Sequence, residues 1–282
     1  MEEYDKKMGS LFEPIEEQIL PTTSGNELIS DMIESGKPFA ASRIGSIELR
    51  SVMCNILSLA QPSTILCNNA GVCLPSESEY VEFANLFTKR IADIDLMALW
   101  QKDEMSLISK QIISGNLTYL RALEPYYFES PWSSKLEGKK VLIIHPFTET
   151  MDKQFNKREL LFSGNILPKF EPIFLKAKQT SGLYNSNWFE CLYEMENMIS
   201  MIDFDVAIIG CGGYGLPLAS YIKNMGKQAI HMGGATQILF GIKGRRWDKH
   251  DIISKLYNEH WVRPDVTERP SNYLDIEWGC YW

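Results

Sequence analysis

The feature that most constrains this chain is the alternation of short apolar runs with helical patterns from residue 139 to residue 232. Four runs with the length of buried strands stand at 139–147, 172–175, 204–209 and 228–232. The segments between them place apolar residues at helical spacing. Helices that alternate with strands buried on both faces are typical of a parallel sheet with right-handed crossovers. We therefore expect an α/β fold with a mostly parallel, Rossmann-like sheet and helices on both faces.

The first 130 residues carry a shorter version of the same pattern. Residues 39–43 and 95–100 have the composition of strands, and a helix is predicted to begin near Ile47. Ser76 followed by Glu79 has the spacing of a capping box, which predicts the start of an amphipathic helix. Helices are thus predicted at 27–34 with Asn26 as its cap, and at 76–92, 150–162, 187–201 and 216–225.

The stretch 125–138 resembles a linker and suggests a division of the chain. We expect an N-terminal α/β portion, 1–130, which holds the segment around Arg43 and Glu48. A Rossmann-like nucleotide-binding portion with a C-terminal tail, 131–282, follows it. The pattern leaves open whether these portions are two lobes or one continuous domain.

A glycine-rich loop joins the predicted strand at 204–209 to the next predicted helix. Residues 210–215, Gly-Cys-Gly-Gly-Tyr-Gly, match the pattern G-x-G-x-x-G in this strand–helix context. Glycines there allow positive φ and a close backbone approach, and the start of the helix exposes unpaired N–H groups to an anion. The loop therefore predicts a site for a phosphate-bearing ligand. Tight packing between strand and helix is the alternative explanation of the same glycines.

The strand after this loop argues against a dinucleotide cofactor. It ends in Ile230-His231-Met232, where an NAD-binding unit places an acidic residue for the ribose hydroxyl. A histidine does not accept hydrogen bonds from a ribose in the same way. Hydride transfer therefore becomes a minority interpretation.

Cationic and glycine residues follow that strand. Gly233 and Gly234 come directly after it, at the edge where open α/β sheets bind ligands. Lys243, Arg245 and Arg246 lie shortly beyond, and arginine forks suit diphosphate. The alternative is a solvated basic turn that contacts no ligand.

Three titratable residues stand at predicted element ends. His145 and His231 each close a predicted strand, where either imidazole could act as a general base, donate to a diphosphate or serve only the structure. Glu48 lies at a predicted helix start, where a carboxylate also favours the helix dipole.

Spaced acid pairs occur at three places. Asp93 with Asp95 and Asp203 with Asp205 stand where predicted strands begin, so we expect them to be solvated structural groups. The third pair, in the stretch 275–277, belongs to an aromatic C-terminal tail and reaches a site only if that tail folds back. Aromatic residues at a chain end are more often docked core than a binding platform.

Charge and cysteine content exclude several classes. A net charge of −8 argues against nucleic-acid binding, which needs a basic footprint. The six cysteines lack zinc-ligand spacing, so we expect small buried thiols. Residues 1–17 are charged and polar, and no apolar run reaches the roughly 18 residues of a membrane span. We expect a cytoplasmic protein without a transmembrane segment.

One segment resembles a known family. The run Arg43-Ile-Gly45-Ser46-Ile-Glu48 is similar to the Arg-x-Gly-Asp-x-Glu segment of glycosyltransferases of the GT-D fold, and residues 204–234 resemble that family's closing Rossmann-like unit. The resemblance implies sugar transfer from a nucleotide-sugar donor to a glycan or lipid-linked acceptor in polysaccharide or glycoconjugate biosynthesis. It covers about half of the chain.

The resemblance also implies a metal, and here the chain departs from the family. The D-x-E motif is associated with divalent metal and donor, whereas Ser46 replaces the first acid. The role of the glutamate carries over to Glu48, which is the candidate ligand for Mn²⁺ or Mg²⁺. Metal dependence is therefore in question, and cations beside the diphosphate are the alternative.

Glycosyl transfer is the function that these observations favour. A Rossmann-like methyltransferase or oxidoreductase and a non-catalytic nucleotide-binding protein stay open as alternatives, and so does a homo-oligomer. The candidate catalytic residues are Glu48, His145 and His231; the candidate donor-binding residues are Arg43, Gly45, Gly210, Gly212, Gly213, Tyr214, Gly215, Gly233, Gly234, Lys243, Arg245 and Arg246.

Overall fold

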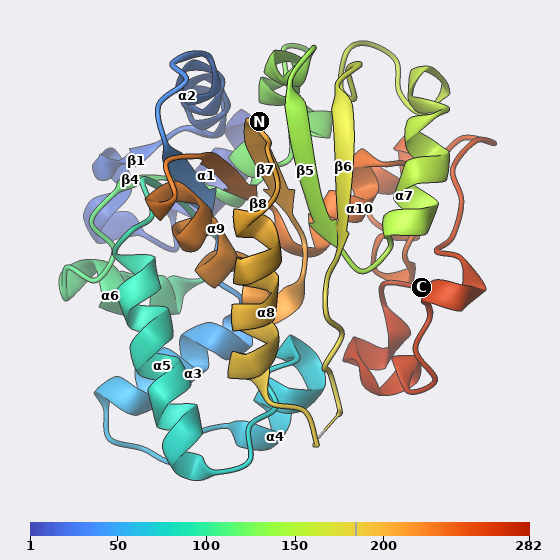
Figure 1. Cartoon of the computed structure of the whole chain (residues 1–282). Coiled ribbons are helices and arrows are strands. Elements are labelled where there is room, and N and C mark those ends of the chain that lie inside the picture. Colours follow the sequence, from blue (N-terminus) through green and yellow to red (C-terminus); the bar gives the residue numbers. More distant parts are fainter. Residues whose placement is uncertain (184) are drawn as a thin grey trace.

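The computed structural model describes residues 1–183 and 185–282, and these build one α/β unit around a parallel sheet (Figure 1). In the described part of the chain the sheet has eight strands, in the order β1-β4-β3-β2-β8-β7-β5-β6. The predicted α/β fold with a parallel, Rossmann-like sheet is confirmed. The strands are β1 (Ile19–Leu20), β2 (Phe39–Ser42), β3 (Leu96–Leu99), β4 (Asn116–Tyr119), β5 (Lys140–His145), β6 (Glu171–Lys176), β7 (Val206–Ile209) and β8 (Gln228–His231).

Two hydrophobic cores flank the sheet, because successive side chains of each strand point to opposite faces. In β5, Leu142 and Ile144 belong to one core and Val141 and Ile143 to the other. The first core is covered by α1 (Glu2–Gly9), α3 (Ser46–Ile56), α5 (Glu77–Ile91), α6 (Met105–Ser109), α8 (Trp188–Ser200) and α9 (Gly215–Asn224). The second is covered by α2 (Thr22–Glu34), α7 (Thr148–Phe155), α10 (Thr236–Leu239) and α11 (Ile253–Leu256), and the short α4 (Ser63–Ile65) lies outside both sets.

Strands of both predicted portions lie in this one sheet. β2 of the N-terminal portion pairs with β8 of the C-terminal portion, in the register from Phe39 opposite Gln228 to Ala41 opposite Ile230. The prediction of a linker at 125–138 is wrong. Trp132 of this stretch is fully buried, so the stretch packs into the fold.

Asn26 explains how that stretch is held. It was predicted to cap a helix, but it lies inside α2, which begins four residues earlier at Thr22. Its side chain donates to the carbonyl of Ser130 at 2.9 Å and accepts the amide of Trp132 at 2.9 Å. The asparagine therefore fastens the stretch 125–138 to the second core.

Several element boundaries differ from the prediction. β1 has two residues, and β4 contains Asn116 and Thr118, so neither shows an apolar run in the sequence. α7 ends at Phe155, earlier than the predicted 162, and a 3₁₀ turn follows. The Ser76 cap is confirmed, since its hydroxyl accepts the amide of Glu79.

The cysteines include a pair that the spacing did not predict. Cys67 and Cys73 form a disulfide that closes the loop between them, whereas both were expected to be free thiols. Disulfides persist mainly in oxidising compartments. This bond therefore does not support the predicted cytoplasmic location, which stays a prediction. In the described part of the chain, no helix is long and apolar enough to cross a membrane.

Candidate functional site

A cavity of about 200 Å³ opens at the carboxyl ends of the central strands. The chain leaves β5 toward β6 and leaves β7 toward β8, in opposite directions across the sheet. Such a divergence creates a crevice beyond the strand ends, where open α/β sheets bind ligands. Side chains that directly follow β2, β5, β7 and β8 line it, as do segments around residues 69–71, 178–181 and 276–282.

Arg43 follows β2 and lines this cavity. Its guanidinium lies over the ring of Trp100, with Cζ 5.2 Å from the centroid, and packs across Gly233. Its Nε is buried without a hydrogen-bond partner among the described residues. A buried guanidinium N–H without a partner is costly. Arg43 is therefore a cavity cation with a buried N–H group that no described protein atom accepts.

Glu48 lies on the first turn of α3, with only 8% of its surface exposed. Its carboxylate lies over Gly45, where a Cβ would collide with it, and this contact explains the glycine. Burial raises the pKa of Glu48, the charge of Arg43 opposes that rise, and the charge of Glu277 adds to it. Glu48 is thus a buried carboxylate inside the cavity wall.

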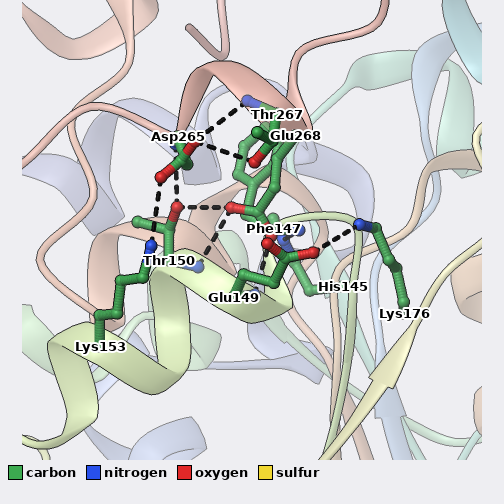
Figure 2. A network of polar contacts seen from close by, with 9 residues as sticks. All are labelled: His145, Phe147, Glu149, Thr150, Lys153, Lys176, Asp265, Thr267 and Glu268. Atoms are coloured by element: carbon green, nitrogen blue, oxygen red, sulfur yellow. Dashed lines mark hydrogen bonds and ion pairs between the residues drawn. The ribbon is translucent and has the colours of Figure 1, made fainter.

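His145 ends β5 and also lines the cavity. Its Nδ1 accepts the backbone amide of Phe147 at 3.0 Å, so in the neutral ring the proton is on Nε2 (Figure 2). Burial lowers the pKa of His145 to about 3. None of the described residues accepts a hydrogen bond from Nε2. The ring is therefore a neutral donor at physiological pH, and a weak base.

His231 ends β8 and is fixed from both sides. Its Nδ1 lies 2.9 Å from the hydroxyl of Ser42, which donates to the carbonyl of Arg43, so Nδ1 carries the proton. Its Nε2 presses against Gly215, where a Cβ would collide with it. Burial and the charge of Arg43 lower the pKa of His231 to about 3. The second imidazole is also neutral.

The glycine loop lines the cavity, but most of its glycines face protein atoms. A Cβ on Gly210 would lie 2.6 Å from the carbonyl of Gly233, and one on Gly213 would lie 2.6 Å from Val72. Gly212 has φ +56° and lies against the carbonyl of Ala70. Close packing, the alternative left open by the sequence, therefore accounts for these glycines.

Tyr214, the fifth residue of the loop, belongs to the core. Its ring stacks on Trp188 at 5.3 Å between centroids, and its hydroxyl lies 2.7 Å from that of Thr180. The residue is 1% exposed. It joins the loop to the segment 178–181, and both Tyr214 and this segment line the cavity.

The three predicted cations after β8 separate in space. Arg246 lines the cavity, whereas Lys243 lies over the ring of Tyr257 and Arg245 donates to the carbonyl of Trp278. Gly233 and Gly234 also line the cavity. The cluster in the sequence is thus a single cavity cation with two neighbours outside.

The C-terminal tail folds back over the cavity, which the sequence did not settle. Ile276, Glu277, Tyr281 and Trp282 all line it. The tail has no strand or long helix, so no periodic pattern could place it. Figure 1 shows this red segment beyond the carboxyl ends of β5 and β6.

Two further lining residues hold unused polar atoms. Gln237 Oε1 and Trp282 Nε1 are buried without a hydrogen-bond partner among the described residues. Together with the Nε of Arg43, they give the wall two donors and one acceptor. Unpaired buried groups of this kind are uncommon in native proteins and point to a polar ligand.

The described residues of the cavity wall offer few ligands for the metal that the resemblance implies, and this metal stays a prediction. Across residues 1–183 and 185–282, no group of three or more His, Cys, Asp or Glu side chains is arranged to hold a metal ion. The charge of Arg43 acts on the Glu48 carboxyl group. Ser46, which replaces the first acid of the motif, is exposed. The acid pairs at 93–95 and 203–205 lie at the strand starts, away from the cavity, as expected, and Asp95 and Asp203 form ion pairs with Lys223 and Lys140.

Comparisons with family models, with curated proteins and with solved structures find no match for this chain. The fold and the cavity therefore define its class by themselves. It is a parallel α/β protein with a cationic, histidine-lined cavity at the carboxyl edge of its sheet.

Proposed function

We propose that this chain is a glycosyltransferase that moves a sugar from a nucleotide-sugar donor to a glycan or lipid-linked acceptor. The observation that carries the proposal is the guanidinium of Arg43, with its unpartnered Nε, in a cavity at the ligand-binding edge of the sheet. An arginine in that position suits the diphosphate that joins nucleoside and sugar.

The chemistry of the other wall residues supports the same ligand. Breaking the bond between sugar and diphosphate develops negative charge on the leaving oxygen. Arg43 and the Nε2–H of His145 would face that charge as preorganised donors, and Arg246 would add a second cation. Glu48 would accept a hydrogen bond from a sugar hydroxyl. No step requires a metal.

The alternative functions fit the wall less well. A dinucleotide enzyme needs an acid at the end of β8, and His231 occupies that end with its Nε2 against Gly215. The glycine loop faces mainly protein atoms, which weakens the argument for any cofactor held by that loop alone. A role in polysaccharide biosynthesis, a cytoplasmic location and a homo-oligomer remain predictions from the sequence.

The test is a binding panel on the purified full chain. Calorimetry would compare UDP, GDP, CDP and ADP with the matching nucleosides, and thermal shifts would then rank nucleotide-sugars, NAD⁺, NADP⁺ and S-adenosylmethionine, each with and without Mn²⁺. We expect one nucleoside diphosphate and its sugar conjugates to bind. Preferential stabilisation by NAD(P)⁺ or S-adenosylmethionine would contradict the proposal.

Arg43→Gln and Arg245→Ala form a matched pair for this panel. A charge-assisted hydrogen bond contributes about 1.5–3 kcal/mol, so Arg43→Gln should weaken the diphosphate by roughly 10- to 150-fold and leave the nucleoside unchanged. Arg245 is exposed and outside the cavity, so its loss should have little effect. Equal losses from both variants would indicate nonspecific charge attraction.

A further inference from the structure

The C-terminal segment is fastened to the rest of the chain at several points. Glu268 accepts the amides of Glu149 and Thr150 at 2.8 and 3.1 Å, and thereby caps the first turn of α7 (Figure 2). Further along, Arg246 donates its amide to the carbonyl of Cys280 at 2.9 Å. The Trp282 ring, 8% exposed, packs in the second core. The segment is thus a built wall of the cavity.

Glu277 is the carboxylate that this wall presents to the cavity. Its Oε2 accepts from the Arg246 guanidinium, from the Tyr281 hydroxyl at 3.0 Å and from the Cys280 thiol at 3.4 Å. Within the described residues, no hydrogen bond reaches Oε1. The side chain is 27% exposed. One oxygen is therefore fixed while the other is free to meet a ligand.

Sugar transfer needs a group that receives the acceptor's proton, and the two histidines are poorly suited to it. His145 already uses Nδ1 to accept an amide, and His231 presses its Nε2 against Gly215. Neither ring thus offers a free basic nitrogen to an acceptor. The cavity has two carboxylates that could serve instead, Glu48 and Glu277.

Position distinguishes the two carboxylates. Glu48 is 8% exposed and folded over Gly45, deep beside Arg43. An acceptor is a glycan or lipid-linked sugar, so it has to approach from solvent. Glu277 stands on the outer wall, partly exposed and with a free oxygen. The deep carboxylate thus suits the donor sugar, and the outer one suits the acceptor.

We propose, on the basis of the glycosyltransferase function above, that Glu277 is the general base for the acceptor hydroxyl. In that step the acceptor oxygen forms a bond to the anomeric carbon as its proton passes to Glu277 Oε1. The bond between that carbon and the diphosphate oxygen breaks, and its electron pair leaves with the diphosphate. Glu277 then returns the proton to solvent. Arg246, Tyr281 and Cys280 keep the carboxylate oriented through Oε2.

The test compares Glu277→Gln, Glu277→Asp and the control Asp275→Asn in the full chain. Asp275 is exposed and lies outside the cavity on the same segment. Turnover of the nucleotide-sugar that binds best would be measured with an alkyl glycoside and with water as acceptors, beside calorimetry with its nucleoside diphosphate. Gln keeps the hydrogen bonds of Oε2 but cannot take a proton. A general base contributes about 10²–10⁴-fold, so Glu277→Gln should lose at least a hundredfold in turnover while its diphosphate affinity changes by less than about threefold.

Each outcome decides between distinct conclusions. Partial turnover by Glu277→Asp with wild-type behaviour of Asp275→Asn supports the base. A loss of diphosphate affinity that matches the loss of turnover would mean that Glu277 only orients Arg246, and it would overturn the inference. Wild-type turnover by Glu277→Gln would overturn it while leaving the glycosyltransferase intact. A wild-type chain that neither transfers nor hydrolyses any nucleotide-sugar would overturn both.

Discussion

Phe147 donates its backbone amide to His145 Nδ1 over 3.0 Å, and this contact fixes which ring nitrogen of His145 carries the proton. The chain turns directly after β5, so the histidine and the amide two residues later meet within one turn. The remaining N–H, on Nε2, belongs to a residue of the cavity wall. A strand-end histidine thereby becomes a neutral hydrogen-bond donor.

Two substitutions of His145 should have opposite effects. His145→Asn places Oδ1 where Nδ1 was, so it retains the acceptor for Phe147 and loses the Nε2 donor. We expect at least a tenfold loss in nucleoside diphosphate affinity at nearly constant melting temperature. His145→Gln can place its amide near the Nε2 position but leaves the Phe147 amide unpaired, which costs about 1–3 kcal/mol of stability. Calorimetry and thermal unfolding of both variants check this, and parallel losses in the two properties would contradict it.

The histidines also predict how stability responds to acid. Burial lowers the pKa of His145 and His231 to about 3, so below pH 6.5 the unfolded chain binds more protons at these rings and stability falls. Burial raises the pKa of Glu104 and of Glu124 to about 7, so between pH 7 and about 4.5 these two carboxyl groups oppose the two histidines. We expect a shallow slope above pH 4.5 and a steep loss below it. Chemical denaturation from pH 3.5 to 7 would show it, and His145→Asn should reduce the lower slope by about 1.4 kcal/mol per pH unit.

Contact between Gly215 and His231 gives a prediction for the glycine loop. A Cβ at residue 215 would collide with His231 Nε2, so Gly215→Ala should destabilise the fold by about 1–3 kcal/mol. In a His231→Ala background the same change should be nearly neutral, because the colliding ring is gone. A double-mutant cycle of unfolding free energies measures this coupling. Additive effects would place the ring elsewhere.

This loop shows both what the sequence predicted and where prediction stopped. Strand β7, helix α9 and the glycine turn between them follow from local patterns, and so does the edge of the sheet that carries the cavity. The partners of the glycines do not, because Gly213 meets Val72 and Gly215 meets His231 from distant parts of the chain. A G-x-G-x-x-G pattern reports a need for small residues, and the chain alone does not say whether a phosphate or a side chain imposes it.

Glu277 illustrates the same limit at the site. The sequence shows Glu277 as part of a spaced acid pair, but the segment around it has no periodic pattern that predicts where its side chains point. Contacts of Glu268 and Arg246 with distant residues turn it toward the cavity. Cys67 and Cys73 are a second case, since their pairing depends on a tight turn that their spacing of six does not specify.

That disulfide predicts a link between redox state and binding. It closes the loop whose residues Asn69 and Gly71 line the cavity, and Thr180 donates to the carbonyl of Gly71. Replacing both disulfide cysteines by serine should lower stability by about 2 kcal/mol through the entropy of the unfolded chain, and should weaken nucleoside diphosphate binding. Cys54→Ser, at a free cysteine, is the control. Unchanged melting temperature and affinity in the double variant would show that the loop is held without the bond.

Glu48→Gln separates a site carboxylate from one that only favours a helix start. Glu48 and Glu79 occupy the same third position of their helices, α3 and α5, but Glu48 is buried in the cavity wall, whereas Glu79 is only partly buried and lies outside the cavity. A residue that only favours the dipole should lose at most about 1 kcal/mol of stability on conversion to glutamine, and this is our expectation for Glu79→Gln.

For Glu48→Gln we expect no loss of stability but a large loss of turnover. Burial raises the pKa of Glu48, which means that the protein disfavours its charge, so removing the charge should leave the melting temperature equal or higher. Turnover of the nucleotide-sugar should nevertheless fall by roughly a hundredfold or more, because the amide cannot replace an anionic acceptor for a sugar hydroxyl in the transition state. The measurement is turnover and thermal unfolding of wild type, Glu48→Gln and Glu79→Gln side by side. If Glu48→Gln retained turnover within a few-fold of wild type, Glu48 would be a structural residue, and the donor sugar would have to be held by other groups of the wall.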